Sequence, residues 1–234
     1  MALYFGKTKA CNGSGNQSEW KIYFDNGGKL WAYNDYKAKI TTLAPYLDFS
    51  DTADVTDFSH MFANNTALTT IPKLDMRKGT NFYSIFANCA SLTALPKFDL
   101  SSAQDLMGFA RGCSSLVEVP AFDTRNATSF RYMFMDCSSL KEAPALDVGN
   151  ADSNGGLGLM LGNCAALERV HLKNIKQDLD ISASTLYTAE ALLEVLGNLA
   201  TITDTQTLTL GATNLAKLTD AEKAIATSKG WTLA

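Results

Sequence analysis

Apolar and polar residues follow one pattern that returns every 24 residues through the middle of the chain. Most copies carry an aspartate, a pair of large apolar residues, a small residue, a leucine and a proline in the same order. A fixed period of roughly 20 to 50 residues is the signature of a solenoid, because one unit cannot bury its apolar side without its neighbours. The pattern predicts five stacked units over about residues 50–172, the fifth after a three-residue expansion in VGNADSNGG.

Two kinds of pattern follow one another within each unit. Large apolar residues first stand at i, i+3, i+4, i+7 and i+10, which is one face of a short helix or helical turn. The segments that follow, such as SLTALP and SLVEVP, are short and end at proline, which indicates short strands. Each unit is therefore predicted to be a helical turn plus a strand. In the first unit the helical positions are Phe58, Met61, Phe62, Asn65 and Leu68.

The regions on either side of the repeats have a different pattern of apolar and polar residues. Residues 1–46 hold two aromatic, alternating segments around a Gly-rich turn at 20–33, which predicts a β-hairpin in an N-terminal β-rich domain or cap. The solenoid is assigned to residues 47–172. Residues 173–234 lose the period and are expected to form a C-terminal α/β cap that covers the last open edge.

The predicted cap has clear helix-boundary signals. Thr188 is a candidate N-cap, Thr219 and Glu222 stand in capping-box register, and Gly230 marks the end of the second helix. The expected elements are a helix at 188–199, a strand at 205–211, a helix at 219–230 and a last strand in WTL.

Cysteine occupies the small-residue column in four units, where CSSL is written twice 24 residues apart. A disulfide is disfavoured because side chains in parallel register do not point at one another. Zinc is disfavoured because the spacing offers no close pair of ligands and no histidine joins the column. Free cysteine is commonly buried as a small apolar residue. We therefore expect a reduced ladder in the core, formed by Cys89, Cys113, Cys137 and Cys164, whereas Cys11 lies in a polar loop.

Aspartate also recurs once in each unit, from Asp51 onward. Stacked carboxylates repel one another if they are exposed and unpaired. The structural interpretation is turn capping, in which the carboxylate accepts from a backbone N–H two or three residues on. Calcium is the functional alternative, although one aspartate per unit is sparse for a calcium-binding repeat. The column comprises Asp75, Asp99, Asp123 and Asp147.

Charge and composition exclude several classes of function. The formal net charge is −4 and no Lys/Arg run occurs, so nucleic acid is not an expected partner, because phosphate binding needs clustered cations. No apolar run approaches the roughly 20 residues of a membrane span, which argues against membrane insertion. No nucleotide-binding, metalloprotease or nucleophile-elbow motif occurs. We therefore expect no cofactor.

A short polar cluster, DFSH, places Asp57, Ser59 and His60 together and suggests a hydrolase. A catalytic triad needs a base in contact with the nucleophile and a carboxylate that orients the base. Consecutive residues on a helical turn point in different directions, and the aligned positions vary from unit to unit. We expect no catalytic residue and no metal site.

The variable positions of the units are expected to form extended faces suited to binding another large surface. Tyrosine at such a position is a good contact candidate because it offers a large area at low entropic cost. The candidate binding residues are Lys73, Tyr83, Lys97, Glu118, Tyr132, Lys141 and Glu142.

The unit F-x-x-M-F-x-x-C-S-S-L-x-x-x-P-x-L-D resembles the BspA-like leucine-rich repeats of bacterial surface proteins, and residues 126–147 are close to that consensus. The resemblance covers about residues 50–172 and implies an α/β leucine-rich repeat solenoid. Repeat 3 departs from it with GFARGC, and repeat 5 departs with its expansion. The ending LTLGATNLAKLTDAEKAIATSKGWTLA is similar to the C-terminal segments of such proteins in phages and prophages of gut bacteria.

The resemblance implies a function without catalysis, because family members are described as surface adhesins or virion structural components. The first residues lack the features of a Sec signal, and no wall-sorting motif is found. We therefore expect a binding or structural module of a phage virion, such as a tail or fibre appendage, with a bacterial cell-surface adhesin as the alternative. Expected partners are a protein or glycan on a host cell surface or neighbouring virion proteins, and a homo-oligomer is compatible with this role.

Overall fold

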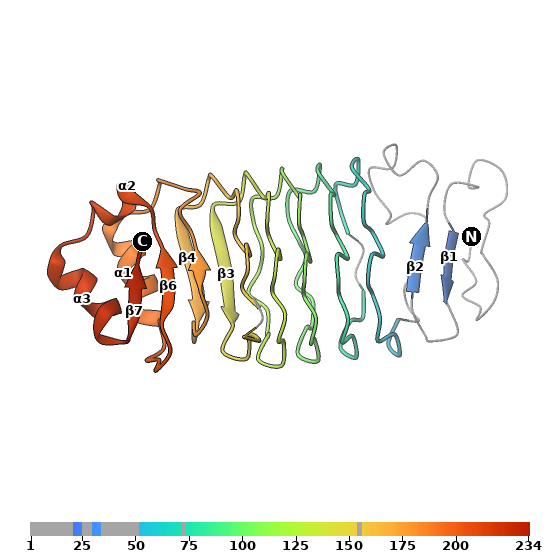
Figure 1. Ribbon diagram of the computed structural model, residues 1–234. Coiled ribbons are helices and arrows are strands. Elements are labelled where there is room, and N and C mark those ends of the chain that lie inside the picture. Colours follow the sequence, from blue (N-terminus) through green and yellow to red (C-terminus); the bar gives the residue numbers. More distant parts are fainter. Residues whose placement is uncertain (1–20, 25–29, 34–51, 72–73, 154–155) are drawn as a thin grey trace.

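Successive units of the repeat lie side by side along the long axis of the molecule, in the order of the sequence (Figure 1). This computed structural model describes residues 21–24, 30–33, 52–71, 74–153 and 156–234. The helices of the C-terminal region lie at one end of the stack and the first two strands at the other.

The predicted N-terminal hairpin is present as two strands. β1 (Lys21–Phe24) pairs antiparallel with β2 (Leu30–Tyr33), with Lys21 opposite Tyr33. The rest of the predicted domain at 1–46, including Cys11, lies outside the described residues.

Parallel backbone bridges join each unit to the next. Asp57 pairs with Asn81, and Asn81 pairs with Asp105, so the predicted period of the sequence is the step of the stack. Inside, the Phe58 ring lies parallel to the Phe82 ring with 5.3 Å between centroids. Backbone pairing at the surface and ring stacking in the core therefore act at the same spacing.

The backbone of the first half of each unit has an alternating pattern of hydrogen bonds. One N–H donates to a carbonyl of the next unit, as from His60 to Tyr83 at 2.9 Å. The following N–H closes a turn within its own unit, as from Met61 to Phe58 at 3.2 Å. Both kinds of bond satisfy donors that the stack removes from water. We call these segments together the turn ribbon, and they comprise residues 57–65, 81–89, 105–113, 129–137 and 156–164.

The turn ribbon is not helical, which corrects the predicted helical turn. Among the described residues, α-helices begin only at Ala189. Two residues in each ribbon segment, four positions apart, have a left-handed backbone, and this reverses the curl of the chain after each turn. The inward side chains therefore recur about every four residues, which is close enough to the ~3.6 of a helix to give the same sequence pattern. The left-handed residues are His60, Asn64, Ser84, Asn88, Gly108, Gly112, Tyr132, Asp136, Leu159 and Asn163.

The segment after the ribbon forms a strand that lengthens along the stack. Ala94 pairs with Glu118 through a single parallel bridge. In the next units, β3 (Glu142–Asp147) pairs in parallel with β4 (Arg169–Lys173), with a register shift between Ala143 and Leu146. β3 overlaps the predicted strand but continues past Pro144, where the strand was expected to end, and the segment at Ala94 forms a single bridge.

Three further strands continue the parallel pairing toward the C-terminus. They form one sheet in the order β5, β6, β7, and each pair is parallel. The strands are β5 (Leu179–Asp180), β6 (Gln206–Thr209) and β7 (Trp231–Leu233).

The helices of this region begin and end at the predicted signals. The Thr188 side chain accepts from the backbone N–H of Ala191. Thr219 and Glu222 form a complete capping box, and Gly230 follows the second long helix with φ 90°. The first helix packs against β4 and the last against β7. The helices are α1 (Ala189–Asn198), α2 (Ala212–Leu215) and α3 (Asp220–Ser228).

One hydrophobic core runs through the repeats and the C-terminal region, from Val55 to Trp231. The boundary predicted after residue 172 falls inside β4, and a parallel bridge from Ile175 to Leu199 continues the pairing beyond it. The C-terminal region therefore shares the core of the stack that it covers.

The left-handed positions of the ribbon generate a prediction of stability. Gly112 has φ +74°, and a Cβ there would lie 2.4 Å from the Asn88 Oδ1. The Asn88 side chain donates to the Asn64 Oδ1 (2.9 Å) and would have to move. We expect Gly112→Ala to lower the free energy of unfolding by about 2 kcal/mol, from backbone strain and the lost hydrogen bond. Urea denaturation measures the change.

Gly197 in α1 provides the matched control, because no atom lies within 4 Å of its Cβ position. Gly197→Ala should raise the stability by up to about 1 kcal/mol, since alanine loses less backbone entropy in a helix. Equal effects of the two substitutions would contradict the importance of the left-handed backbone at Gly112.

Candidate binding face

The four cysteines of the repeat are free and fully buried. Each thiol donates to a backbone carbonyl of the preceding unit, as from Cys113 Sγ to the Phe86 oxygen at 3.2 Å. The same Phe86 carbonyl also accepts from the backbone N–H of Cys89, at 3.1 Å, within its own unit. The thiol is thus a weak donor within the core as well as a small apolar group, a role that the spacing alone did not reveal. The equivalent thiol bonds run from Cys89 to Phe62, from Cys137 to Ala110 and from Cys164 to Phe134.

Burial keeps these thiols protonated. It raises the pKa of Cys113 and of Cys164 from 9.0 to about 12. It also raises the pKa of Cys137 well above the ordinary value, and the neighbouring thiols add to this effect. A thiolate is the form that attacks electrophiles and binds metals. The protonated thiols of the cysteine ladder are therefore suited to a structural role.

The aspartate column caps turns. Each carboxylate accepts from the backbone N–H two residues on, as at Asp99 from Ser101 (3.0 Å) and at Asp147 from Gly149 (3.0 Å). The Ser101 hydroxyl lowers the pKa of the Asp99 carboxyl. Asp51 lies outside the described residues. Arg77 and Arg125 pair with the two remaining carboxylates, those of Asp75 and Asp123.

A second column of such caps was not recognised in the sequence. Asp57 accepts from the Ser59 N–H at 2.8 Å, and Asp105 accepts from the Met107 N–H at 2.8 Å. Within the described residues the buried Ser59 hydroxyl has no hydrogen-bond partner, while the His60 ring lies edge-on to Tyr83. The DFSH cluster therefore contains a turn cap, without the serine–histidine bond on which a triad depends.

The outward side of the turn ribbon brings aromatic and cationic side chains together. The guanidinium of Arg131 lies 4.7 Å from the centre of the Tyr132 ring, and that of Arg111 lies 5.6 Å from it. The two arginines lie in adjacent units of the repeat, and the stacking of these units places both beside the same ring. Further along, the Tyr83 ring meets His60 with 4.8 Å between centroids. Both predicted tyrosines thus lie on the ribbon.

Apolar side chains extend this surface toward the C-terminal end of the stack. Leu159 is 47% exposed and has a left-handed backbone with φ 51°. Gly162 lies close to both Leu159 and Met135. A Cβ added at Gly162 would lie 3.5 Å from a side-chain atom of each. We call this surface the ribbon face, formed by His60, Tyr83, Met107, Arg111, Arg131, Tyr132, Met135 and Leu159.

The other predicted binding residues lie away from the ribbon face. Glu118, Lys141 and Glu142 are exposed on the strand segments, and Lys97 is exposed after the proline of its unit. Lys73 lies outside the described residues. The seven candidates therefore do not form one site.

One of them takes part in a contact that joins three elements. The Glu142 Oε2 on β3 lies 3.6 Å from the His171 Nε2 on β4. The His171 Nδ1 lies 2.6 Å from the Glu194 Oε1 on α1. Histidine replaces the proline of the repeat here, and it links the strand to the helix that packs on it.

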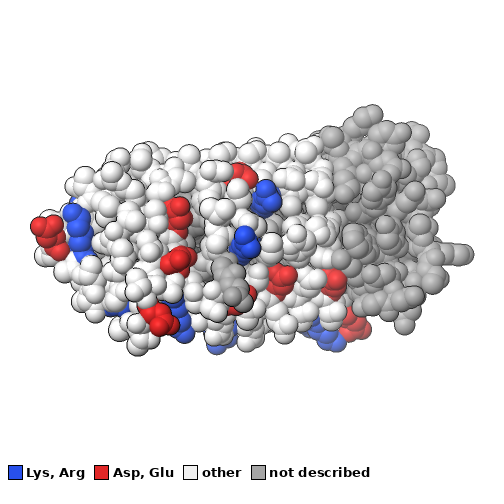
Figure 2. Space-filling model, in the orientation of Figure 1, with Lys and Arg blue, Asp and Glu red and all other residues white. Residues whose placement is uncertain are grey.

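Sequence analysis missed the arginines, the methionines and Leu159 as members of the ribbon face. A signal for them exists, because with a period of four the left-handed position and the one before it fall outside the inward columns, although the small residues Ser59, Ala63 and Ala87 are buried there. The helical period of ~3.6 residues does not single out the same outward positions. On the face shown in Figure 2, positive and negative side chains are scattered among uncharged ones, and some opposite charges lie next to one another.

The described residues contain neither a candidate membrane-spanning helix nor a candidate metal site. Within the described ranges, no helix has the length and apolarity of a membrane span. Those same ranges contain no group of three or more His, Cys, Asp or Glu side chains arranged to hold a metal ion.

A protein-family model matches part of the chain. Residues 34–148 match the family described as Mycoplasma protein of unknown function, DUF285. This family is associated with BspA-like repeat proteins. The matched segment covers the first repeats and ends before the expansion in the fifth unit. Neither the curated proteins nor the solved structures contain a match to the chain.

The buried thiols predict how stability changes at alkaline pH. Between about pH 9 and 12 the unfolded chain loses thiol protons that Cys113 and Cys164 retain in the folded state. The stability contribution is therefore complete below pH 9 and is lost as the pH rises, by up to about 1.4 kcal/mol per pH unit for each thiol. Urea midpoints measured across this range should fall more steeply in the wild type than in Cys113→Ala.

The alanine variant should itself lose about 1 kcal/mol near neutral pH through the small cavity that it leaves. Equal slopes for the two proteins would contradict the raised pKa of Cys113. As an independent check, an aromatic disulfide reagent should modify the four buried thiols rapidly only in denaturant.

Proposed function

We propose that the chain is a non-enzymatic binding and structural module, built as a leucine-rich repeat solenoid, and that it is a component of a phage virion such as a tail or fibre appendage. Through the ribbon face it engages a protein or glycan on a host surface, or a neighbouring virion protein.

The ribbon face is the observation that carries this proposal. Tyr, Met and Arg are enriched in interfaces because they offer large, adaptable contact areas. Here Tyr132 is held between two guanidinium groups, and Leu159 exposes nearly half of its surface. The backbone beneath them is fixed by hydrogen bonds between units. Binding on such a rigid surface loses little conformational entropy.

The similarity of the C-terminal sequence to phage and prophage proteins supports the virion. The alternative is a bacterial cell-surface adhesin, and it is supported by the association of the matched family with BspA-like repeat proteins. Both versions use the same kind of face, so the location of the protein distinguishes them.

Immunogold electron microscopy tests the location. Antibodies against the chain should label the tails of phage particles released from the source culture. Label confined to the bacterial envelope would contradict the virion location and support the cell-surface adhesin. Label confined to the cytoplasm, in cells that release unlabelled particles, would contradict both.

A binding assay tests the face itself. The fluorescently labelled protein should bind host cells, and Tyr132→Ala and Arg131→Ala should each weaken this binding by roughly tenfold or more, as expected for anchors of an interface. Lys141→Ala is the matched control, since this exposed residue lies on the strand segment. If only Lys141→Ala weakens the binding, the ribbon face is the wrong surface.

A further inference from the structure

The hydrogen-bond ladder of the turn ribbon ends abruptly at the fifth unit. The N–H groups of Phe82, Leu106 and Phe130 each donate to a carbonyl of the following unit, the last to Gly156 at 2.8 Å. Leu157 is the equivalent residue in the fifth unit, and its N–H makes no hydrogen bond in the described part of the chain. A hollow of about 570 Å³ lies beside this position and is lined by Leu157, by the loop between β4 and β5 and by the loop that follows α1.

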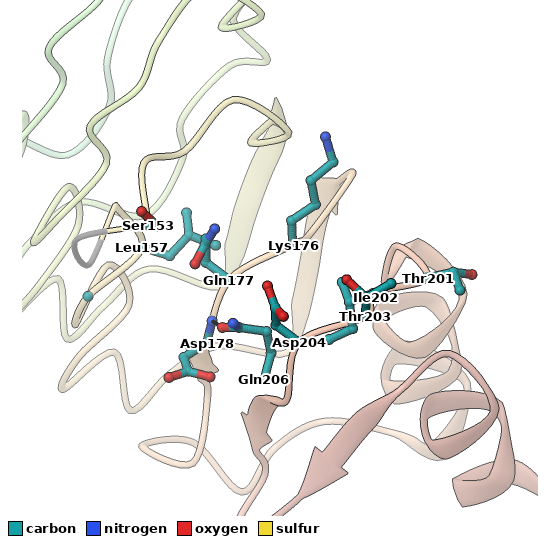
Figure 3. A pocket seen from close by; sticks show the side chains of 11 residues that line it. Ser153, Leu157, Lys176, Gln177, Asp178, Thr201, Ile202, Thr203, Asp204 and Gln206 are labelled. Carbon is teal, nitrogen blue, oxygen red and sulfur yellow. Dashed lines mark hydrogen bonds between the residues drawn. The ribbon is translucent and has the colours of Figure 1, made fainter.

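Polar and apolar groups both line the hollow, and some of its polar atoms make no hydrogen bond within the described part of the chain. Figure 3 shows Gln177, Asp178, Asp204 and Gln206 gathered around its middle, while Lys176 extends away from them. The Lys176 ammonium donates to the Gly149 carbonyl at 3.0 Å. This arrangement leaves the carboxylates as the main charged groups of the hollow.

Two of these side chains are held in place by the backbone. The Asp178 N–H donates to the Gln206 Oε1 (2.9 Å), and the Asp178 Oδ1 accepts from the Thr207 N–H (2.6 Å). The Asp178 Oδ2 and the Gln206 amide nitrogen have no hydrogen bond among the described residues, and neither has the Asp204 carboxylate. The hollow therefore presents fixed acceptors, an amide donor and the unpaired N–H of Leu157.

We propose that this hollow is a binding site for a neutral saccharide unit, separate from the ribbon face. The hydroxyls of a sugar both donate and accept, so they match two carboxylates, an amide and a backbone N–H at once. The partly buried Ile202 side chain supplies apolar surface for the C–H groups of the ring. A site of this kind orients its ligand with a small number of placed polar groups.

Other ligand classes fit the lining less well. Asp178 and Asp204 repel phosphates and acidic sugars, and the one lysine is engaged elsewhere. The described residues offer no group of three ligands for a metal ion. A peptide that continued the ribbon ladder would bond to successive N–H groups, but Leu159, the next of them, is not part of the lining.

Saturation-transfer difference NMR with the full chain tests the proposal. The probes are the methyl glycosides of glucose, galactose, mannose, rhamnose, N-acetylglucosamine and N-acetylgalactosamine, with glucuronic acid, N-acetylneuraminic acid, spermidine and tetraalanine for comparison. We expect at least one neutral glycoside to bind at millimolar concentration and the acidic sugars to give no signal. Asp204→Ala should weaken that binding by roughly ten- to a hundredfold, through loss of hydrogen bonds to a charged acceptor.

Two variants serve as controls. Thr205→Ala changes an exposed neighbour on the same loop that is not part of the lining, and Tyr132→Ala changes the ribbon face. Both should bind the glycoside as the wild type does, and all variants should keep the wild-type melting temperature. The proposal is overturned if no neutral glycoside binds, if Asp204→Ala binds equally well, or if spermidine or tetraalanine is the better ligand. These outcomes leave the ribbon face untouched, because its assay uses host cells and a different variant.

Discussion

The fold depends on the backbone N–H groups of the turn ribbon, every second one of which must reach a carbonyl of the next unit. A regular helix cannot do this, because its N–H groups are used along its own axis. The left-handed residues solve the problem by turning alternate N–H groups sideways, as at Asn64 and Asn88. The cost of a left-handed backbone is lowest for glycine and for asparagine or aspartate. The second left-handed column accordingly holds only these residues.

The side-chain columns follow from this backbone. A turn that curls and reverses every four residues sends two side chains inward, and the more exposed positions lie in the pair between them, where small residues such as Ser59 and Ala63 are still buried. The inward columns become stacked rings and thiols, and each thiol finds a carbonyl of the unit before it, as Cys113 does at Phe86. The outward columns are free of packing constraints, which allows a face that mixes Tyr132 with arginine, methionine and leucine. Stability and recognition thus use alternate positions of the same ribbon.

The hydrogen-bond ladder of the turn ribbon ends at the fifth unit, and this shapes the surface beside it. Stacked repeats leave one unit whose donors have no following unit, and a cap normally covers them. Here the C-terminal region shares the core and pairs through β5 to β7, yet it leaves a polar hollow beside Leu157. Ser153, which precedes the repeat segment of the fifth unit, and the loop around Asp204 line this hollow. Irregular segments supported by a rigid stack are where binding sites commonly occur.

Sequence by itself determined the period, the buried columns, the turn-capping aspartates, and the caps of α1 and α3, because each of these depends on contacts that recur locally or at a fixed spacing. Thr188, for example, needs only its own helix. It did not determine the backbone of the ribbon, since repeats of about four and ~3.6 residues give the same apolar pattern over so short a segment. Nor did it show that Arg111 and Arg131, twenty residues apart, flank one tyrosine. Only the tertiary structure decided that contact and the hollow beside Leu157, because both arise where different units meet and neither leaves a periodic trace in the chain.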